Sequence, residues 1–384
     1  MSGLNPYRSA LLLRCFTFAF FMTGALVTAY FPLYFDARGY SKIQIGILYS
    51  VGPLIGIFSN ILWGLLSDKF QTIKRLMHVL LAGQLIMVTI MLNLDLFAAL
   101  FITITCFFFF QTPMSALGDS LALLAASQTG KSYASFRIWG SLGFAVAAVG
   151  FGMLLQRIGQ DWTLYMALGT IFISLLLSFI VSDRPGGKGK VQFNGLLDIL
   201  RSRRLLAFFL LVFIISVAHR INDSYLSLFL LKLGAPETIV GWTWTMSAIS
   251  EIPMFFLLAR YGHHFRELPL LVIASLMYFI RFVLMAITTD PLLIVAIQGM
   301  HSLSFGIYFV TALRFLQQLI PDEYRSSGQA MFTVVWSGCA GITAGTTGGW
   351  IFDSLGPEAV YWWAAILSFL ASLGFLLFHF RNGH

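Results

Sequence analysis

The amino-acid sequence predicts an all-α integral membrane protein with twelve transmembrane helices in two pseudo-symmetric six-helix bundles. An apolar composition, repeated apolar runs and a polar linker at the midpoint carry this prediction. Of 384 residues, 58% are hydrophobic and only 10% are charged, whereas soluble domains carry about 25% charged residues. At roughly 20 apolar residues per crossing, the chain has room for about twelve helices.

Breaks between the apolar runs place the individual helices. Short turns such as Asn93 to Asp95 and Thr289 to Pro291 alternate with loops that carry most of the Lys and Arg residues. The expected spans are 8–34, 43–66, 75–94, 96–126, 132–156, 162–182, 204–231, 238–259, 267–288, 291–317, 325–349 and 359–380.

The loop charges predict sidedness. The basic loops fall on one side together with Arg8 and Arg381, and the other side has only Arg38, Lys42, Arg157 and Lys232. By the positive-inside rule both termini are cytoplasmic, which predicts a multi-pass protein of a bacterial cytoplasmic (inner) membrane. The net charge of +8 is explained by this topology, and no nucleic-acid partner is expected because the basic residues form no single patch.

A polar, glycine-rich stretch from Ser182 to Lys190 separates six expected helices from six others. We therefore expect an N-terminal bundle over 1–182, a cytoplasmic linker over 183–203 and a C-terminal bundle over 204–384. The spans 132–156 and 325–349 both open near an Arg and are rich in glycine. Corresponding positions in the two halves favour a parallel repeat.

A few ionisable residues lie inside these apolar spans. Each costs roughly 2.5–3.5 kcal/mol in the bilayer core, so such residues pair with one another or line a water-filled path. They favour a carrier for a polar solute, with a central cavity lined by charges, over an inert scaffold. The residues are Asp119, Arg137, His219, Arg220, Asp223, Glu251, Arg281 and His301.

Other functional classes find no support in the sequence. There is no phosphate-binding glycine loop, no metal-ligand spacing and no nucleophile beside a base, so neither an enzyme nor a metal site is expected. The cysteines Cys15, Cys106 and Cys339 lie in apolar segments and suggest no disulfide framework. No cofactor is expected, and the absence of a nucleotide-binding domain leaves an ion gradient, such as that of protons, as the energy source.

The loop from Gly64 to Arg75 (GLLSDKFQTIKR) resembles the signature loop of the major facilitator superfamily. An Asp at a helix end can cap a neighbouring helix N-terminus, and basic residues can add charge pairs. The resemblance implies a conformational latch, whereas an ordinary basic loop is the alternative. The latch residues are Gly64, Asp68, Lys69, Lys74 and Arg75.

Four segments, 113–120, 133–144, 250–253 and 298–306, resemble the lactose-permease-like branch, and most of all its phenylpropionate permease group. The resemblance implies that a fourth-helix carboxylate and a fifth-helix Arg hold substrate, while a Glu, an Arg and a His of later helices couple it to protons. Residues at these positions are Asp119, Arg137, Glu251, Arg281 and His301. No carboxylate follows His301, and Phe144 replaces a sugar-stacking Trp although Trp139 lies nearby. Lactose itself is therefore not expected.

The sequence positions of the charged residues predict two pairs. Asp119 and Arg137 are each nine residues from Gln128 and lie at equal depth in an antiparallel hairpin, where they can form a bidentate pair. The pair can bind substrate or simply lock two helices. Asp223 lies three residues after Arg220, so ligand contact and mutual neutralisation both stay open.

The sequence thus predicts a secondary active transporter that works by alternating access, as a proton symporter for a small organic acid, with aromatic acids included. A sugar or nucleoside symporter, a proton-antiport exporter of drugs or metabolites, and a non-transporting receptor are the alternatives. We expect a monomer in the lipid bilayer. The expected substrate-binding residues are Asp119, Arg137, Trp139, Asp223 and Arg281, and the expected proton-coupling residues are Glu251, His301 and Arg281.

Overall fold

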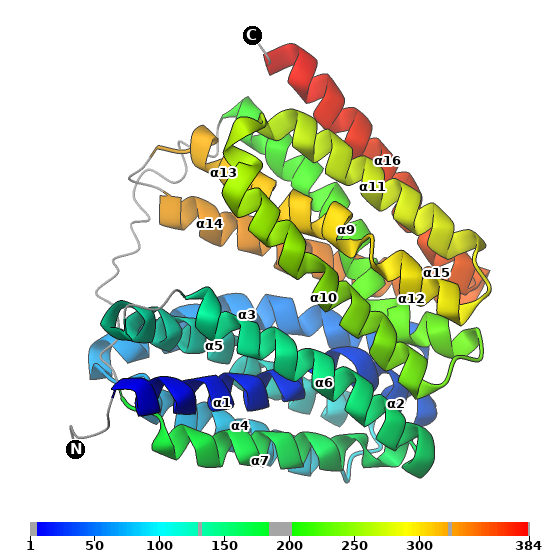
Figure 1. Cartoon of the computed structure of the whole chain (residues 1–384). Coiled ribbons are helices and arrows are strands. Elements are labelled where there is room, and N and C mark those ends of the chain that lie inside the picture. Colours follow the sequence, from blue (N-terminus) through cyan, green and yellow to red (C-terminus); the bar gives the residue numbers. More distant parts are fainter. Residues whose placement is uncertain (1–5, 130–132, 184–201, 322–324, 383–384) are drawn as a thin grey trace. The chain divides into compact units, whose positions relative to one another are not determined.

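The computed structural model describes residues 6–129, 133–183, 202–321 and 325–382, and all regular structure in these ranges is helical. Every expected span is present there as one helix or as helical segments in direct succession (Figure 1). The predicted fold class is therefore confirmed. Most of the expected linker, residues 184–201, lies outside the described residues.

The first six spans end within a few residues of their expected limits. They are α1 (Pro6–Ala25) with η1 (Leu26–Tyr30) and α2 (Phe31–Ala37), α3 (Lys42–Phe70), α4 (Lys74–Met91), α5 (Phe97–Thr129), α6 (Ala134–Ile158), and η2 (Gln160–Trp162) with α7 (Thr163–Ile180).

The last six spans follow the same pattern. They are α9 (Arg203–Lys232), α10 (Glu237–Tyr261) followed by η3 (Gly262–His264), α11 (Glu267–Ile287), α12 (Pro291–Gln298) with η4 (Ser302–Gly306) and α13 (Ile307–Leu319), α14 (Arg325–Thr333) with η6 (Val334–Cys339) and α15 (Ala340–Leu355), and α16 (Pro357–Asn382).

Ten of the described helical runs are long and apolar enough to cross a membrane. The other two expected spans, α10 and the run α14–η6–α15, are helical as well but contain more polar and glycine residues. Polar residues are costly against lipid, so these two spans are the natural places for surfaces that contact a polar solute.

The chain divides into two compact units. Unit 1 comprises Met1–Arg38, Val51–Gly189 and Pro236–Gly241, and unit 2 comprises Gly39–Ser50, Lys190–Ala235 and Trp242–His384.

In unit 1, α1 packs along α6 and α7, and α4 packs along α5 and α7 (Figure 1). The contact between α1 and α6 depends on Gly143, because a Cβ there would overlap the backbone carbonyl of Phe18. Small residues allow two helix backbones to approach this closely. Gly143 is one of the glycines in which the span 132–156 is rich.

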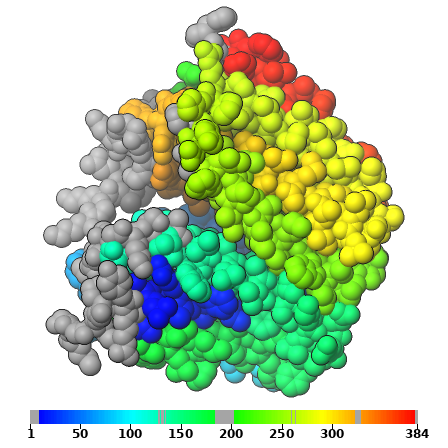
Figure 2. Space-filling view, in the orientation of Figure 1, coloured from blue at the N-terminus to red at the C-terminus, as the bar shows by residue number. Residues whose placement is uncertain are grey.

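In unit 2, α11 packs against α16 and α13, and α9 packs against α16 and α15. Apolar side chains cover much of the outside. The side chains of α12, in yellow, form part of the surface seen in Figure 2, where Leu292 and Leu293 are exposed. The arrangement leaves the polar side chains of α9, α10, α11 and η4 to meet one another inside the unit.

In the described ranges, three π-helical segments, η1, η4 and η6, interrupt spans that the sequence predicts as regular α-helices. A π segment adds a residue to the turn and changes the direction of the side chains around it, and such segments are frequent at functional sites. In unit 2, η4 begins directly after His301 and η6 contains Trp336 and Ser337.

Candidate functional site

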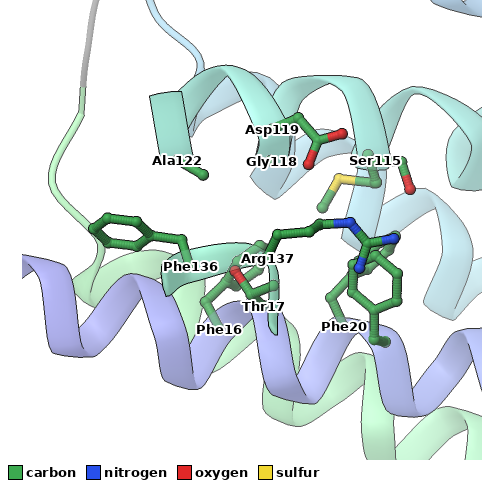
Figure 3. A pocket seen from close by; sticks show the side chains of 11 residues that line it. Phe16, Thr17, Phe20, Ser115, Gly118, Asp119, Ala122, Phe136 and Arg137 are labelled. Carbon is green, nitrogen blue, oxygen red and sulfur yellow. The ribbon is translucent and has the colours of Figure 1, made fainter. Parts of the chain in front are cut away.

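Arg137 lines a pocket in unit 1 between α1, α5 and α6. Figure 3 shows its side chain lying between Asp119 and Ser115 of α5 and the aromatic side chains of α1. The guanidinium carbon is 4.5 Å from the ring centroid of Phe21. The Nη1 atom is buried and has no hydrogen-bond partner among the residues that the structure describes. A buried, unpaired charged donor is costly, and the pocket beside it has a volume of about 10 Å³, which is room for one water-sized group.

Asp119 lies beside Arg137 but is bound by another residue. The Tyr133 hydroxyl donates a hydrogen bond to Oδ1 of Asp119 over 2.8 Å. Burial, together with this carboxylate, raises the pKa of Tyr133 to about 12, so the hydroxyl keeps its proton. The expected direct pair between Asp119 and Arg137 is not formed among the described contacts, and one oxygen of the carboxylate is bound by the Tyr133 hydroxyl instead.

Trp139 lies on α6, two residues after Arg137, and is half-buried. It is not one of the residues that line the Arg137 pocket. Two positions along an α-helix differ by roughly 200° in direction, so residues at i and i+2 face nearly opposite ways. Its expected role in substrate binding stays a prediction.

Unit 2 contains a buried chain of three ionisable residues from three helical elements. Nη1 of Arg281 lies 2.8 Å from Nδ1 of His301, and Nε2 of His301 lies 2.8 Å from Oε1 of Glu251. A guanidinium can only donate. Nδ1 of His301 must therefore accept, and the ring hydrogen sits on Nε2, where it is donated to Glu251.

Arg281 is completely buried, and further side chains surround its charge. Nη2 donates to the amide oxygen of Gln298, and Nη1 is also 3.3 Å from the hydroxyl of Ser304. Ser247 donates to the same Gln298 oxygen over 3.0 Å. This network fixes the guanidinium in position, which in turn fixes the tautomer of His301.

A second chain runs beside the first. The Tyr278 hydroxyl is 3.0 Å from Nδ1 of His219, and Nε2 of His219 is 3.4 Å from Oδ2 of Asp223. Arg220 Nη1 lies 3.3 Å from the same oxygen, so the pair expected from the i, i+3 spacing is present. Unit 2 thus holds two carboxylates, each approached by a histidine.

The two histidines belong to one aromatic stack. The His219 ring is parallel to Phe305 within 9°, at 4.7 Å between centroids, and lies 5.0 Å from the Trp336 ring. The His219 and His301 rings are 5.8 Å apart. The stack holds both imidazoles in place, with Nε2 of His301 2.8 Å from Glu251 and Nε2 of His219 3.4 Å from Asp223.

Sequence reasoning left several of these residues out of the site. Gln298 precedes His301 by three residues and could have been recognised from that spacing as a neighbour on the same helix face. The partnerships of Tyr133, Tyr278 and Trp336 depend on how separate helices are rotated, for which the sequence holds no signal.

The predicted latch lies at the junction of α3 and α4. Asp68 and Lys69 lie in the last turn of α3, and Gln71 donates to the backbone carbonyl of Asp68 over 2.6 Å. The N-terminus of α4 is capped by Asp183, which accepts from the Lys74 backbone N–H over 3.1 Å and from the Thr72 hydroxyl over 2.6 Å. The helix cap that Asp68 could have made is therefore made by Asp183, and the role of Asp68 in a latch stays a prediction.

Comparison with known proteins agrees with this architecture. Residues 11–364 match the family model of the MFS_1 like family. The chain belongs to this family. It is thus a multi-pass membrane transporter of the major facilitator superfamily and not an enzyme, and such transporters bind small-molecule substrates.

Its relatives are transporters with different named substrates. The maltose permease of Geobacillus stearothermophilus is 26% identical over 93% of this chain and 91% of its own length. The probable 3-phenylpropionic acid transporter of Escherichia coli is 22% identical over 91% of this chain and 93% of its own. A mutant of the nucleoside transporter NupG shares the fold, with a TM-score of 0.88 at 18% identity over 96% of this chain and 99% of the other.

Proposed function

We propose that this protein is a secondary active transporter that moves a small organic acid together with protons by alternating access. The observation that carries the proposal is Nη1 of Arg137, a buried guanidinium nitrogen at a pocket wall without a partner among the described residues. An ionised carboxylate is the ligand that best matches a planar guanidinium, because both oxygens can accept in parallel.

The proton-coupling part of the proposal concerns unit 2. His301 donates to Glu251, and Arg281 holds His301 from the other side. When Glu251 takes up a proton, it loses its charge and no longer needs the imidazole hydrogen bond. The contact between His301 and Glu251 therefore changes strength with each proton loaded, which is what coupling requires.

A neutral sugar or nucleoside is the second candidate cargo. The named maltose permease and the fold of NupG favour it. The buried guanidiniums of Arg137 and Arg281 favour the acid, because neutral hydroxyls do not compensate a buried positive charge as a carboxylate does.

The proposal also covers the membrane in which the protein lies and its oligomeric state. The basic loops support insertion in a bacterial cytoplasmic membrane with both termini cytoplasmic. We propose a monomer as the working unit. Chemical labelling of a cysteine introduced at Asn382, from inside and outside spheroplasts, tests the orientation of the C-terminal end.

A thermal-shift screen of the purified protein tests the cargo. Aromatic acids, aliphatic acids, sugars and nucleosides are compared at equal concentration, because a ligand raises the melting temperature by mass action. Stabilisation by acids, lost in Arg137→Ala, is the expected result. Stabilisation by a sugar or nucleoside alone would overturn the acid proposal.

A further inference from the structure

Unit 2 also contains a pocket, which is lined by none of the residues of the Arg281–His301–Glu251 chain. Its seven lining residues come from α13, α14 and η6, and its volume is about 380 Å³. Sites for small molecules fall in the range of roughly 300–1,000 Å³. The pocket is therefore large enough for a molecule with one aromatic ring.

Aromatic rings form one wall of this pocket. Phe332 and Trp336 are parallel within 6°, with centroids 6.1 Å apart, and both are nearly completely buried. Phe309 meets Phe332 at 62° and Trp336 at 56°. Aromatic rings favour offset-stacked and edge-to-face contacts, and the partly exposed ring of Phe309 can offer such a contact to a flat ring.

Polar side chains of α14 and η6, the run that also carries Phe332 and Trp336, line the pocket as well. Gln329, Thr333 and Ser337 line the pocket at intervals of four residues, which places them on one helix face. Ser337 accepts a hydrogen bond from Nη2 of Arg220 over 2.8 Å. Its hydroxyl hydrogen is not used in that bond and can be donated to a ligand oxygen.

The charge nearest Trp336 in the described part of the pocket is that of Arg220, whose guanidinium carbon lies 5.8 Å from the Trp336 ring centroid and whose Nη1 is paired with Oδ2 of Asp223 over 3.3 Å. A ligand with a flat ring against Phe309 and a hydrogen-bond acceptor toward Ser337 suits this lining.

We infer that the pocket formed by Phe309, Gln329, Phe332, Thr333, Trp336 and Ser337 is a ring subsite that selects aromatic carboxylates over aliphatic ones. The inference rests on the proposed organic-acid transport and names the part of unit 2 that decides between acids. The Trp336 ring also stacks on His219, so an occupied ring subsite borders the second histidine–carboxylate chain directly.

The test compares three acids of related shape on the purified full chain: 3-phenylpropionate, cyclohexanepropionate and hexanoate. Wild type should bind 3-phenylpropionate about fivefold more tightly than cyclohexanepropionate, since only the former offers an aromatic face. Isothermal titration calorimetry measures each dissociation constant.

Thr333→Trp fills the pocket from an exposed position, and Ala330→Trp is its matched control on the same helix, exposed and outside the pocket. Thr333→Trp should remove the preference for 3-phenylpropionate while hexanoate binding stays unchanged, and Ala330→Trp should keep the preference. Phe309→Leu preserves an apolar side chain but removes one ring, and should reduce the preference without filling the pocket.

The outcomes separate the two proposals. If acids bind but Thr333→Trp and Ala330→Trp behave alike, the ring subsite is wrong and acid transport stands. If hexanoate and 3-phenylpropionate bind equally to wild type, selection of rings is likewise wrong. If no acid binds, both proposals fall. If uridine binds and Thr333→Trp blocks it, the pocket accepts a ring but not an acid, which overturns the stated ligand class.

Discussion

His301 and Glu251 are joined by a hydrogen bond of 2.8 Å from Nε2 to Oε1 inside unit 2. The direction of this bond is determined by Arg281, which can only donate to Nδ1 of the same ring. Glu251 is thus the acceptor at the end of a polarised chain, and it is the member with partial access to the outside, with 23% of its side chain exposed. An acid in this position can exchange a proton while its partners stay buried.

Glu251→Gln should abolish proton-driven accumulation and leave substrate binding and exchange between equal pools intact. The amide keeps the volume and can still accept from His301, but it cannot carry a proton. Proteoliposomes with an imposed pH gradient measure accumulation, and isotope exchange measures the second activity.

Glu358→Gln is the matched control, because Glu358 is an exposed acid in the first turn of α16. It should accumulate substrate like wild type. Wild-type accumulation by Glu251→Gln would show that another acid, such as Asp223 or Asp119, couples protons.

Asp223 and Arg220 should be energetically coupled. Asp223→Asn leaves the Arg220 guanidinium without its carboxylate, and removing one partner of a buried pair costs about 3–5 kcal/mol. Because Arg220 is only part-buried, we expect a cost of about 2 kcal/mol, discounted for solvent screening.

The double variant Arg220→Gln/Asp223→Asn should recover much of this loss, because it leaves no unpaired charge. Denaturation of the four proteins in detergent forms a double-mutant cycle that measures the coupling. Strictly additive effects would mean that the 3.3 Å contact contributes nothing to stability.

The sequence alone predicted the spans well and the contacts within the site poorly. Apolar runs of the required length fixed the limits of α4 and α11 to within a few residues, because membrane thickness constrains helix length. The pairing of Arg220 with Asp223 was predictable, since both lie on one helix face. The Tyr133 bond to Asp119 was not, because it depends on the rotation of α5 and the entry to α6.

The π segments explain a further part of the difference between the contacts predicted from the sequence and those in the structure. Hydropathy patterns do not distinguish a regular helix from one with an extra residue in a turn. The segments η4 and η6 change the direction of Phe305 and Trp336 relative to a regular helix, and these residues enclose His219. The helical spans of unit 2 and the ionisable residues inside them were therefore predictable from the sequence, whereas the aromatic stack around His219 was not.

Asp183→Asn should destabilise the junction before α4. The carboxylate binds the Lys74 backbone N–H and the Thr72 hydroxyl, and loss of its charge at a helix N-terminus should cost about 0.5–1 kcal/mol. Asp95→Asn is the control, because that side chain is 95% exposed and its contact with Arg38 is 3.7 Å long. Equal melting temperatures for the two variants would contradict the capping role.

Asp68→Asn should leave substrate affinity unchanged and slow transport, if the loop from Gly64 to Arg75 is a conformational latch. In the proposed function, affinity depends on the pocket around Arg137, whereas a latch changes only the rate at which the protein changes state. Equilibrium binding and initial uptake rates on one preparation separate the two effects. If Asp68→Asn lowers the affinity while the uptake rate per molecule of bound substrate stays normal, Asp68 is not part of a conformational latch.

Arg137→Lys should weaken substrate binding nearly as much as Arg137→Ala, by about tenfold or more. A lysine keeps the positive charge but replaces a planar fork with a point charge, so it cannot bind both carboxylate oxygens in parallel. Arg14→Lys is the matched control, because Arg14 belongs to the same unit, donates to Ser135 and lies over the Phe136 ring, and is not a lining residue of the pocket. Its affinity should stay near that of wild type. If Arg137→Lys binds acids as wild type does, charge alone suffices, and the planar fork with its buried Nη1 donor is not what holds the substrate.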